Sequence, residues 1–320
     1  MSLQPEVGKK FIAMNPLALN QSERMNNRQN TRFGIASGSK VYTAVAVAQL
    51  VESGAFQFET KVAELLPGYF PLFDETVTVH HLLTHTSGIP DYFDESTMDD
   101  FEELWRHTPM YTLQTLEDFI PLFNGKPQDF MPGEQFQYNN AAFIVLGLIV
   151  ERIAGKSFQS YVEQEIFTRA GMDDSGYFRL DELPSNTALG YIATEHGVMR
   201  TNQYAIPVVG GADGGAFVTA GDFNKFWNAL FSHKLIGEQH KQQLLSSHVE
   251  VDDSTGYGYG VWMKYGVKGI RKYFVMGFDP GVRFHSSYYP NSKSYITITS
   301  NGEYDLYKIM RSIEEARALD

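Results

Sequence analysis

A serine and a lysine three residues apart are the side chains of this chain best placed to do chemistry. Ser37 and Lys40 stand at the start of an apolar run over 36–54 that has the pattern of a buried helix, so one turn would bring hydroxyl and amine to the same face. A serine hydroxyl attacks only when a base removes its proton, and a lysine is a base only while neutral. The pair therefore predicts acyl transfer through Ser37, with Lys40 as the general base.

Lys40 needs a lowered pKa for this role, because a free lysine titrates near ~10.4. Burial beside the apolar residues 33–36 and 41–51 would lower the pKa, and so would the positive end of the helix dipole. The same helix end leaves the N–H of Ser37 without a partner inside the helix, where it can form half of an oxyanion hole. The alternative for this common spacing is a helix cap followed by a surface lysine.

A tyrosine and an asparagine at the start of another predicted helix are the second candidate. Tyr138 lies two residues before Asn140, where a helix over 140–154 is expected to begin. A phenol beside a serine and lysine pair can relay the proton to the leaving group, and an amide can bind the substrate or hold the lysine. The Tyr-x-Asn pattern occurs again at Tyr289, where a turn is expected, so the pattern alone is not specific.

Other polar residues support weaker hypotheses. His81 and His85 have the i, i+4 spacing that could hold a metal, but no third ligand is evident and a structural role is favoured. Ser87 lacks the Gly-x-Ser-x-Gly context of a Ser-His-Asp hydrolase. Neither group competes with Ser37 and Lys40 as the chemical centre.

Length, composition and charge limit the function classes. The 320 residues are 43% hydrophobic, enough for a large core, and the net charge of −12 argues against nucleic acid as a partner. The longest apolar stretch, 141–150, is too short to span a membrane. There are no cysteines, and the first residues lack a signal-peptide pattern, so the compartment stays open with the cytoplasm slightly favoured. A small molecule or short peptide is the expected partner, and the oligomeric state is open.

The periodicity predicts helices mainly in the first half of the chain and strands mainly in the second. The expected helices cover 36–54, 80–88, 115–123, 140–154, 157–170, 222–231 and 304–318. The expected strands cover 9–19, 258–265, 273–276, 282–288 and 295–300. This order predicts an α+β fold in which an antiparallel sheet is flanked by helices. We expect a discontinuous core over 1–60 and 175–320, with a mostly helical subdomain inserted over 61–174.

Three segments in this order resemble the serine β-lactamase and penicillin-binding-protein superfamily. They are 33–40 (Phe-Gly-Ile-Ala-Ser-Gly-Ser-Lys), 81–88 (His-Leu-Leu-Thr-His-Thr-Ser-Gly) and 132–140 (Pro-Gly-Glu-Gln-Phe-Gln-Tyr-Asn-Asn). The segments 214–222 and 257–262 look like later landmarks of the class C β-lactamase-like branch, which includes esterases, D-amino-acid peptidases and acyltransferases. The resemblance covers most of the chain and implies the β-lactamase-like fold.

The resemblance implies a role for each matching residue. Ser37 would be the acylated nucleophile, Lys40 its base, Tyr138 the second proton-transfer group, and Asn140 a ligand of the substrate amide or of Lys40. The third motif of the superfamily, Lys-Thr-Gly or His-x-Gly, would fall at 275–277, which here reads Val-Met-Gly.

Val275 therefore stands where relatives present a cation or an imidazole. Gly277 is kept, so the strand can approach a substrate closely, and the N–H of Phe278 can complete the oxyanion hole. Asp279 and Arg283 are expected to be surface charges. Otherwise Arg283 could replace the missing cation, or Asp279 could receive a substrate amine.

The sequence thus predicts a serine hydrolase or acyltransferase that acts on an ester, amide or lactam through a Ser37 acyl-enzyme, without a metal or organic cofactor. Esterase-like or peptidase-like activity is favoured, since the loss of a charge-assisted bond would weaken the binding of a substrate carboxylate about ten- to a hundredfold. The alternatives are a catalytically weak penicillin-binding-like protein that holds a peptide or cell-wall-type ligand, and a true β-lactamase or D,D-carboxypeptidase.

Overall fold

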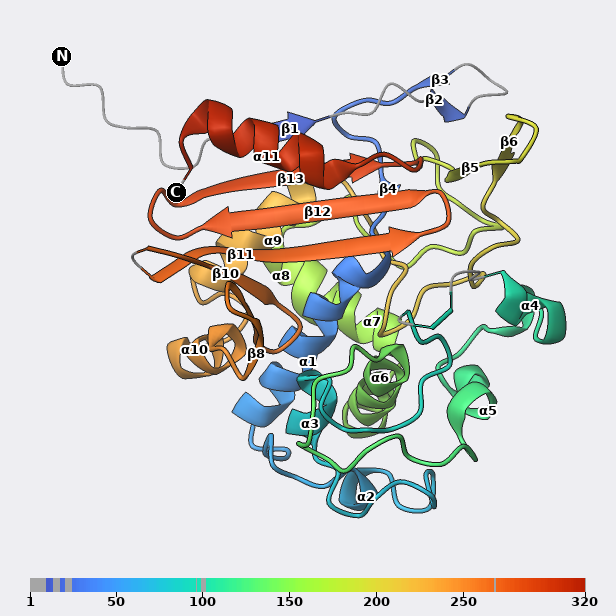
Figure 1. Ribbon diagram of the computed structural model, residues 1–320, viewed down its shortest axis with the longest axis vertical. Helices are drawn as coiled ribbons and strands as arrows, with labels where there is room; N and C mark the ends of the chain where they lie inside the picture. Colours follow the sequence, from blue (N-terminus) through green and yellow to red (C-terminus); the bar gives the residue numbers. More distant parts are fainter. Residues whose placement is uncertain are drawn as a thin grey trace.

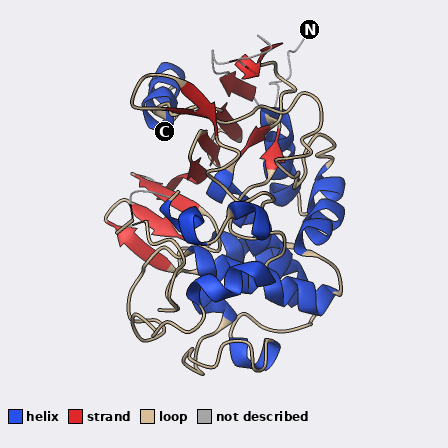
Figure 2. Cartoon of the chain, turned by 90° about the vertical axis from the view of Figure 1, so that its right-hand side faces the viewer, coloured by secondary structure: helices blue, strands red, loops and turns tan. Residues whose placement is uncertain are grey.

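Among the described residues, a seven-stranded sheet forms one side of the molecule, and most of the helices gather on the other (Figures 1 and 2). The computed structural model describes residues 10–13, 18–20, 25–95, 97–98, 102–267 and 269–319, so the first residues, used above to judge the compartment, lie outside it. The expected α+β class is confirmed. No helix in these ranges is long and apolar enough to cross a membrane.

The sheet has the strand order β1-β13-β12-β11-β10-β9-β8. These strands are β1 (Lys10–Ala13), β8 (Val249–Asp252), β9 (Thr255–Tyr257), β10 (Trp262–Gly266), β11 (Gly269–Asp279), β12 (Val282–Tyr289) and β13 (Ser294–Ser300). Neighbours are antiparallel except for β1, which runs parallel to β13 and departs from the expected all-antiparallel sheet. No hairpin joins these two strands, which lie at opposite ends of the chain, so no turn fixes their relative direction.

In the part of the chain that the structure describes, three short strand pairs lie outside this sheet. They are β2 (Ala18–Asn20) with β3 (Met25–Asn26), β4 (Phe33–Gly34) with β7 (Phe217–Val218), and β5 (Tyr191–Ala193) with β6 (Met199–Thr201). The predicted strand over 9–19 is therefore two strands, β1 and β2, separated by residues outside the described ranges.

Helices cover both faces of the large sheet. The helices are α1 (Lys40–Glu52), α2 (Val62–Leu65), α3 (Val79–Leu83), α4 (Glu103–His107), α5 (Ile120–Phe123), α6 (Asn140–Ala154), α7 (Phe158–Val162), α8 (Thr168–Ala170), α9 (Ala220–Phe231), α10 (Glu238–Leu245) and α11 (Leu306–Arg317). Tighter or wider turns are η1 (Ala36–Ser39), η2 (Met110–Thr112), η3 (Glu117–Phe119) and the π-helical η4 (Glu163–Phe167). The π turn interrupts the helix predicted over 157–170, where the hydroxyl of Thr168 donates to the carbonyl of Glu163 at 2.9 Å, five residues back.

The two faces of the sheet bury different sets of side chains. On the inner face, Val275 and Phe284 join the main core with residues of α1, α6 and α9. On the outer face, Tyr289 and Ile298 pack against Met310 of α11, which lies across the sheet (Figure 1). Side chains alternate between the two faces along each strand, so every second residue of β11 or β12 points to the same face of the sheet.

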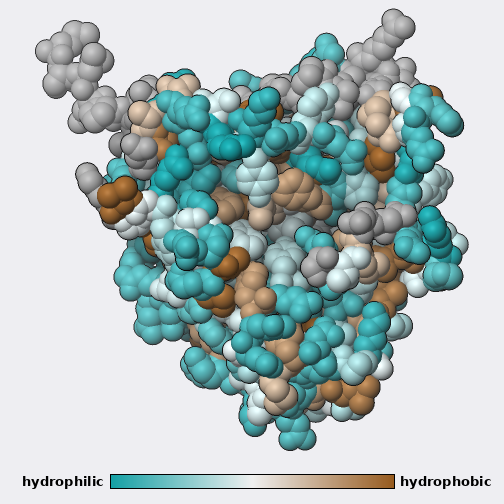
Figure 3. Space-filling model, in the orientation of Figure 1, coloured by the Kyte–Doolittle hydropathy of each residue, from teal (hydrophilic) through white to brown (hydrophobic). Residues whose placement is uncertain are grey.

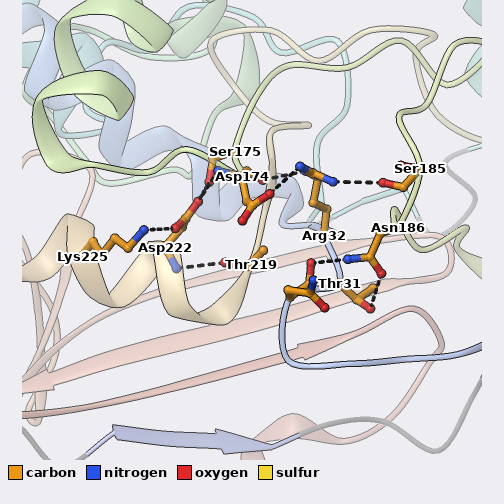
Figure 4. A network of polar contacts seen from close by, with 10 residues as sticks. Thr31, Arg32, Asp174, Ser175, Ser185, Asn186, Thr219, Asp222 and Lys225 are labelled. Carbon is orange, nitrogen blue, oxygen red and sulfur yellow. Dashed lines mark hydrogen bonds and ion pairs between the residues drawn. The ribbon is translucent and has the colours of Figure 1, made fainter.

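A polar network anchors the chain just before β4 (Figure 4). The guanidinium of Arg32 forms an ion pair with Asp174 and donates to the carbonyl of Ser185 at 3.0 Å. The neighbouring Ser175 donates through its hydroxyl to Asp222 of α9 at 3.0 Å. This network holds β4, and with it the turn η1 that follows, against the helices.

Candidate active site

Ser37 lies in η1, the 3₁₀ turn that leads directly into α1. Its Oγ is 2.9 Å from Nζ of Lys40, so the structure brings the predicted pair together. The sequence placed Ser37 in the first turn of an α-helix, but a tighter turn replaces it, because the N–H of Gly38 donates to the carbonyl of Ile35 at 2.9 Å. Ser37 is partly exposed whereas Lys40 is only 2% exposed. A ligand can therefore reach the hydroxyl but not the amine.

The amine of Lys40 has two further partners, the side-chain Oδ1 of Asn140 at 2.8 Å and the carbonyl oxygen of Asp213 at 2.7 Å. Burial lowers the pKa of Lys40, and the nearby Asp213 carboxylate partly opposes that shift. A neutral amine has two N–H groups and one lone pair. Since the two oxygens can only accept, they take the N–H groups and leave the lone pair to the hydroxyl of Ser37.

Asn140 is held in the orientation that serves Lys40. Its Nδ2 donates to the carbonyl of Phe93 at 3.1 Å and lies 3.4 Å from Oδ2 of Asp91, so Oδ1 must face the lysine. The position is fixed because α6 begins here, with the side chain of Asn139 accepting from the N–H of Ala142 at 2.7 Å. Of the two roles that the sequence left open, the contacts support the one toward Lys40.

Tyr138 lies beside both members of the pair. Nζ of Lys40 is 5.0 Å from the centre of its ring, and Ser37 lies near enough to its phenol to influence the pKa of that group. Burial raises the pKa of Tyr138 well above its ordinary value. The phenol therefore stays protonated at neutral pH, which suits a group that passes a proton rather than one that first removes it.

His85 supports Tyr138, a contact that the sequence did not reveal. The two ring centres are 4.3 Å apart. Nδ1 of His85 accepts from the N–H of Asn139 at 3.0 Å, so Nε2 carries the proton and donates to the hydroxyl of Tyr257 at 3.0 Å. Burial lowers the pKa of His85 well below its ordinary value. Both ring nitrogens are thus occupied, while His81 caps α3 through Nδ1.

Gly277 lets β11 lie directly against the turn that carries the serine. A Cβ at this position would be 2.0 Å from the carbonyl oxygen of Ile35 and 2.8 Å from the nitrogen of Gly38. Only glycine fits such an approach without a shift of the strand. The predicted close passage of β11 beside Ser37 is therefore present.

The N–H of Phe278 is free of the sheet. Because a two-residue turn joins β11 and β12, the pair flanking the turn is hydrogen-bonded and the next pair, Phe278 with Arg283, is not. The N–H of Phe278 thus points away from β12, at an edge that β10 leaves open, since β10 pairs with β11 only as far as Phe274. Together with the N–H of Ser37, it would give the two donors that an oxyanion hole needs.

The segment 210–217 closes the site behind the serine. The carbonyl of Ala36 accepts from the N–H of Gly215 at 3.3 Å, and Ala36 has a φ of 46°. For a residue with a side chain this conformation costs about 1–3 kcal/mol, and such strain is found at functional sites. In the same segment, the carboxylate of Asp213 accepts from the hydroxyl of Tyr92. Asp213 was missed in the sequence, where nothing but its glycine-rich surroundings marks it.

These groups meet at a cleft of about 380 Å³. Ser37, Asn140 and Phe278 line it, together with residues of β5, the 206–217 segment and the turn between β11 and β12. A space-filling view in the orientation of Figure 1 shows a hollow near the middle of the face turned to the viewer (Figure 3). Val275 does not line the cleft, because its side chain is 2% exposed in the main core. The place of the expected cation is thus filled by a buried apolar group.

Known proteins are similar to this chain in sequence and in fold. Residues 18–317 match the family model described as Beta-lactamase. A penicillin-binding protein from Bacillus halodurans has a solved structure with a TM-score of 0.91 and 52% identity, covering 93% of this chain and 90% of that one. A penicillin-binding protein of Bacillus subtilis (strain 168) is 29% identical over 75% of this chain and 54% of its own length. Esterase EstB of Burkholderia gladioli is 31% identical over 51% of this chain and 42% of its own length. The chain thus spans about half the length of these two curated relatives.

Proposed function

The chain belongs to the beta-lactamase family of serine hydrolases, and from that premise we propose that it cleaves an ester, amide or lactam through an acyl-enzyme on Ser37. One observation carries this proposal. Lys40 lies 2.9 Å from Ser37 with its other two bonding directions occupied, so its lone pair is directed at the hydroxyl. Tyr138 is the proposed proton-transfer group, and the N–H groups of Ser37 and Phe278 are the proposed oxyanion hole.

Acylation begins when Lys40 takes the proton of Ser37 as Oγ attacks the acyl carbon. The carbonyl oxygen becomes an oxyanion and accepts from the two N–H groups. The proton on Lys40 passes to the leaving group through the phenol of Tyr138, which gives its own proton and receives another. The bond to the leaving group then breaks, and the acyl group remains on Ser37.

Deacylation repeats the sequence with water as the nucleophile. Lys40, neutral again, accepts a proton from the water through Tyr138, and the water oxygen attacks the ester carbon. Collapse of the second oxyanion returns a proton to Oγ of Ser37 and releases the acid. An alcohol or amine in place of water would make the same site an acyltransferase.

The substrate is a small molecule or short peptide, and the esterase among the relatives supports an ester. The buried Val275 bears on the two alternatives in opposite ways. It argues against a β-lactamase or D,D-carboxypeptidase that holds a substrate carboxylate at that position, and it favours a catalytically weak protein that binds a peptide-like ligand. The complete set of Ser37, Lys40 and Tyr138 favours turnover over binding alone.

Covalent labelling tests the proposal. A fluorophosphonate should give one adduct by intact-mass measurement, and none in Ser37→Ala. Lys40→Ala should lower kcat for a neutral aryl ester by about a hundredfold or more, the scale of a lost general base, while the exposed Lys234→Ala keeps the wild-type rate. Labelling that persists in Ser37→Ala would place the nucleophile elsewhere. Hydrolysis of a chromogenic cephalosporin in the same assay would indicate a β-lactamase rather than an esterase.

A further inference from the structure

Carboxylates dominate the charge of the cleft. Five acidic residues line it, and the one basic residue in its lining is Arg283, as far as the described residues go. The acidic residues are Glu95, Glu102, Asp213, Asp279 and Glu303. Lys40 is buried, and its amine contacts Ser37 rather than the cleft. Glu102 and Glu303 form ion pairs with Arg200 and Arg283, so a ligand in this cleft meets the negative charge of Glu95, Asp213 and Asp279.

Arg283 is turned away from the serine. It is paired with Phe278 across β11 and β12, so both side chains lie on the outer face, where the guanidinium is 5.4 Å from the phenyl ring. Its Nη1 donates to the carbonyls of Asp279 at 2.8 Å and Val282 at 2.9 Å, and Nη2 lies 3.5 Å from Glu303. Arg283 thus lines the edge of the cleft, but its guanidinium is bound by these oxygens on the outer face of the sheet and does not replace the missing cation.

Asp279 is turned toward the serine. It lies two residues after Gly277, whose α-carbon faces η1, so its side chain points to the same side of β11. It also follows the residue whose N–H is the proposed oxyanion donor. Burial raises the pKa of Asp279 to about 7, and the nearby Asp213 adds to that shift. The carboxylate lines the cleft, and among the described residues no basic side chain forms an ion pair with it.

We propose that the cleft selects acyl donors that carry a free ammonium close to the acyl carbon, and that Asp279 receives it. Such donors include esters and amides of amino acids and peptides with a free N-terminus. An ammonium supplies the charge that this carboxylate lacks, and a substrate carboxylate would be repelled by the same groups. This inference rests on the proposed function, because it names the substrate class of the same serine.

Three matched donors with one leaving group test the selection. Alanine p-nitroanilide carries the ammonium, propionic acid p-nitroanilide lacks it, and succinic acid mono-p-nitroanilide carries a carboxylate instead. At pH 7.5 both alanine enantiomers are assayed, and the better one should exceed the propionyl donor in kcat/KM by about tenfold or more, the scale of one charge-assisted bond. Equal values, or a preference for the succinyl donor, would overturn the proposal.

The carboxylate is tested by Asp279→Asn, which keeps the shape and removes the charge. This variant should reduce the alanyl-to-propionyl ratio of kcat/KM by about tenfold, back toward one. Asp253→Asn is the matched control, because it removes one negative charge at an exposed position outside the cleft and should leave the ratio as it is in the wild type. An equal loss in both variants would mean that net charge, and not Asp279, selects the donor.

A binding measurement separates this inference from the proposed function. In Ser37→Ala, which cannot form an acyl-enzyme, calorimetry with the same alanyl and propionyl donors should still show tighter binding of the ammonium. Hydrolysis of the propionyl donor without a preference for the alanyl donor would support the proposed function and contradict this inference. Selective binding of the ammonium without acylation of Ser37 in the wild type would support this inference and contradict the proposed function.

Discussion

Gly277→Ala tests whether the close contact between β11 and η1 builds the site. The new Cβ would lie 2.0 Å from the carbonyl oxygen of Ile35, whereas Cβ contacts below 3.0 Å essentially do not occur. The strand must therefore retreat by about 1 Å, and a misplacement of that size can cost about a hundredfold in rate, since the N–H of Phe278 moves with it. We also expect the unfolding free energy to fall by about 1–3 kcal/mol, as for other overpacked sites.

The assay compares kcat for a neutral aryl ester with the midpoint of urea unfolding in the same variant. Gly221→Ala is the control, because a Cβ there meets its nearest neighbour, Oγ1 of Thr219, at an ordinary 3.7 Å. That change lies in α9 and should keep the rate and raise the unfolding free energy by up to about 1 kcal/mol. A rate for Gly277→Ala within twofold of the wild type would refute the idea that this contact sets the oxyanion geometry.

Three further changes have defined outcomes. Val275→Lys places an ammonium in the core and should lower the unfolding free energy by about 3–5 kcal/mol in urea unfolding, with Val275→Ile as the apolar control. His85→Ala leaves the N–H of Asn139 and the hydroxyl of Tyr257 without their partner, so it should cost about 2–5 kcal/mol, and unchanged stability would contradict the contacts described. Burial raises the pKa of Asp91 to about 7, so the folded state keeps a proton that the unfolded state loses near pH 4. Its share of the unfolding free energy must therefore fall as the pH rises from about 4 to 7, and Asp91→Asn should flatten that part of the stability profile.

Local signals predicted much of the fold. The helix expected over 140–154 has those bounds in the structure, because Asn139 caps its start and Gly155, in the left-handed region with a φ of 65°, ends it. The four long strands in the last quarter of the chain were found from their aromatic and β-branched residues, with errors at the ends. The parallel direction of β1 was missed, since nothing local specifies a pairing between residues at opposite ends of the chain.

The partners of the reacting groups were harder to predict than the groups themselves. Ser37 and Lys40 are neighbours in sequence, so helical spacing sufficed to bring them together. Asp213 reaches Lys40 through a backbone carbonyl, and any residue type could supply that oxygen. His85 reaches Tyr257 from 172 residues away, so the contact exists only once the sheet has placed β9 beside the residues that follow α3. Such contacts depend on tertiary packing and leave no pattern in a single sequence.

The roles of the two charges beside the Pro280-Gly281 turn could have been separated from the sequence alone. A two-residue turn makes Asp279 and Val282 partners, and it must then pair Arg283 with Phe278. Partners across a sheet share a face and consecutive residues alternate, so Asp279 and Arg283 have to lie on opposite faces. Only one of them can reach the serine, and Gly277 indicates which, because the residue that must be glycine faces the turn carrying Ser37. The same alternation keeps the Arg283 guanidinium away from the serine and places the Asp279 carboxylate beside the two N–H groups of the proposed oxyanion hole. The charge that the cleft prefers on its acyl donors is therefore the property that tests this structure most directly.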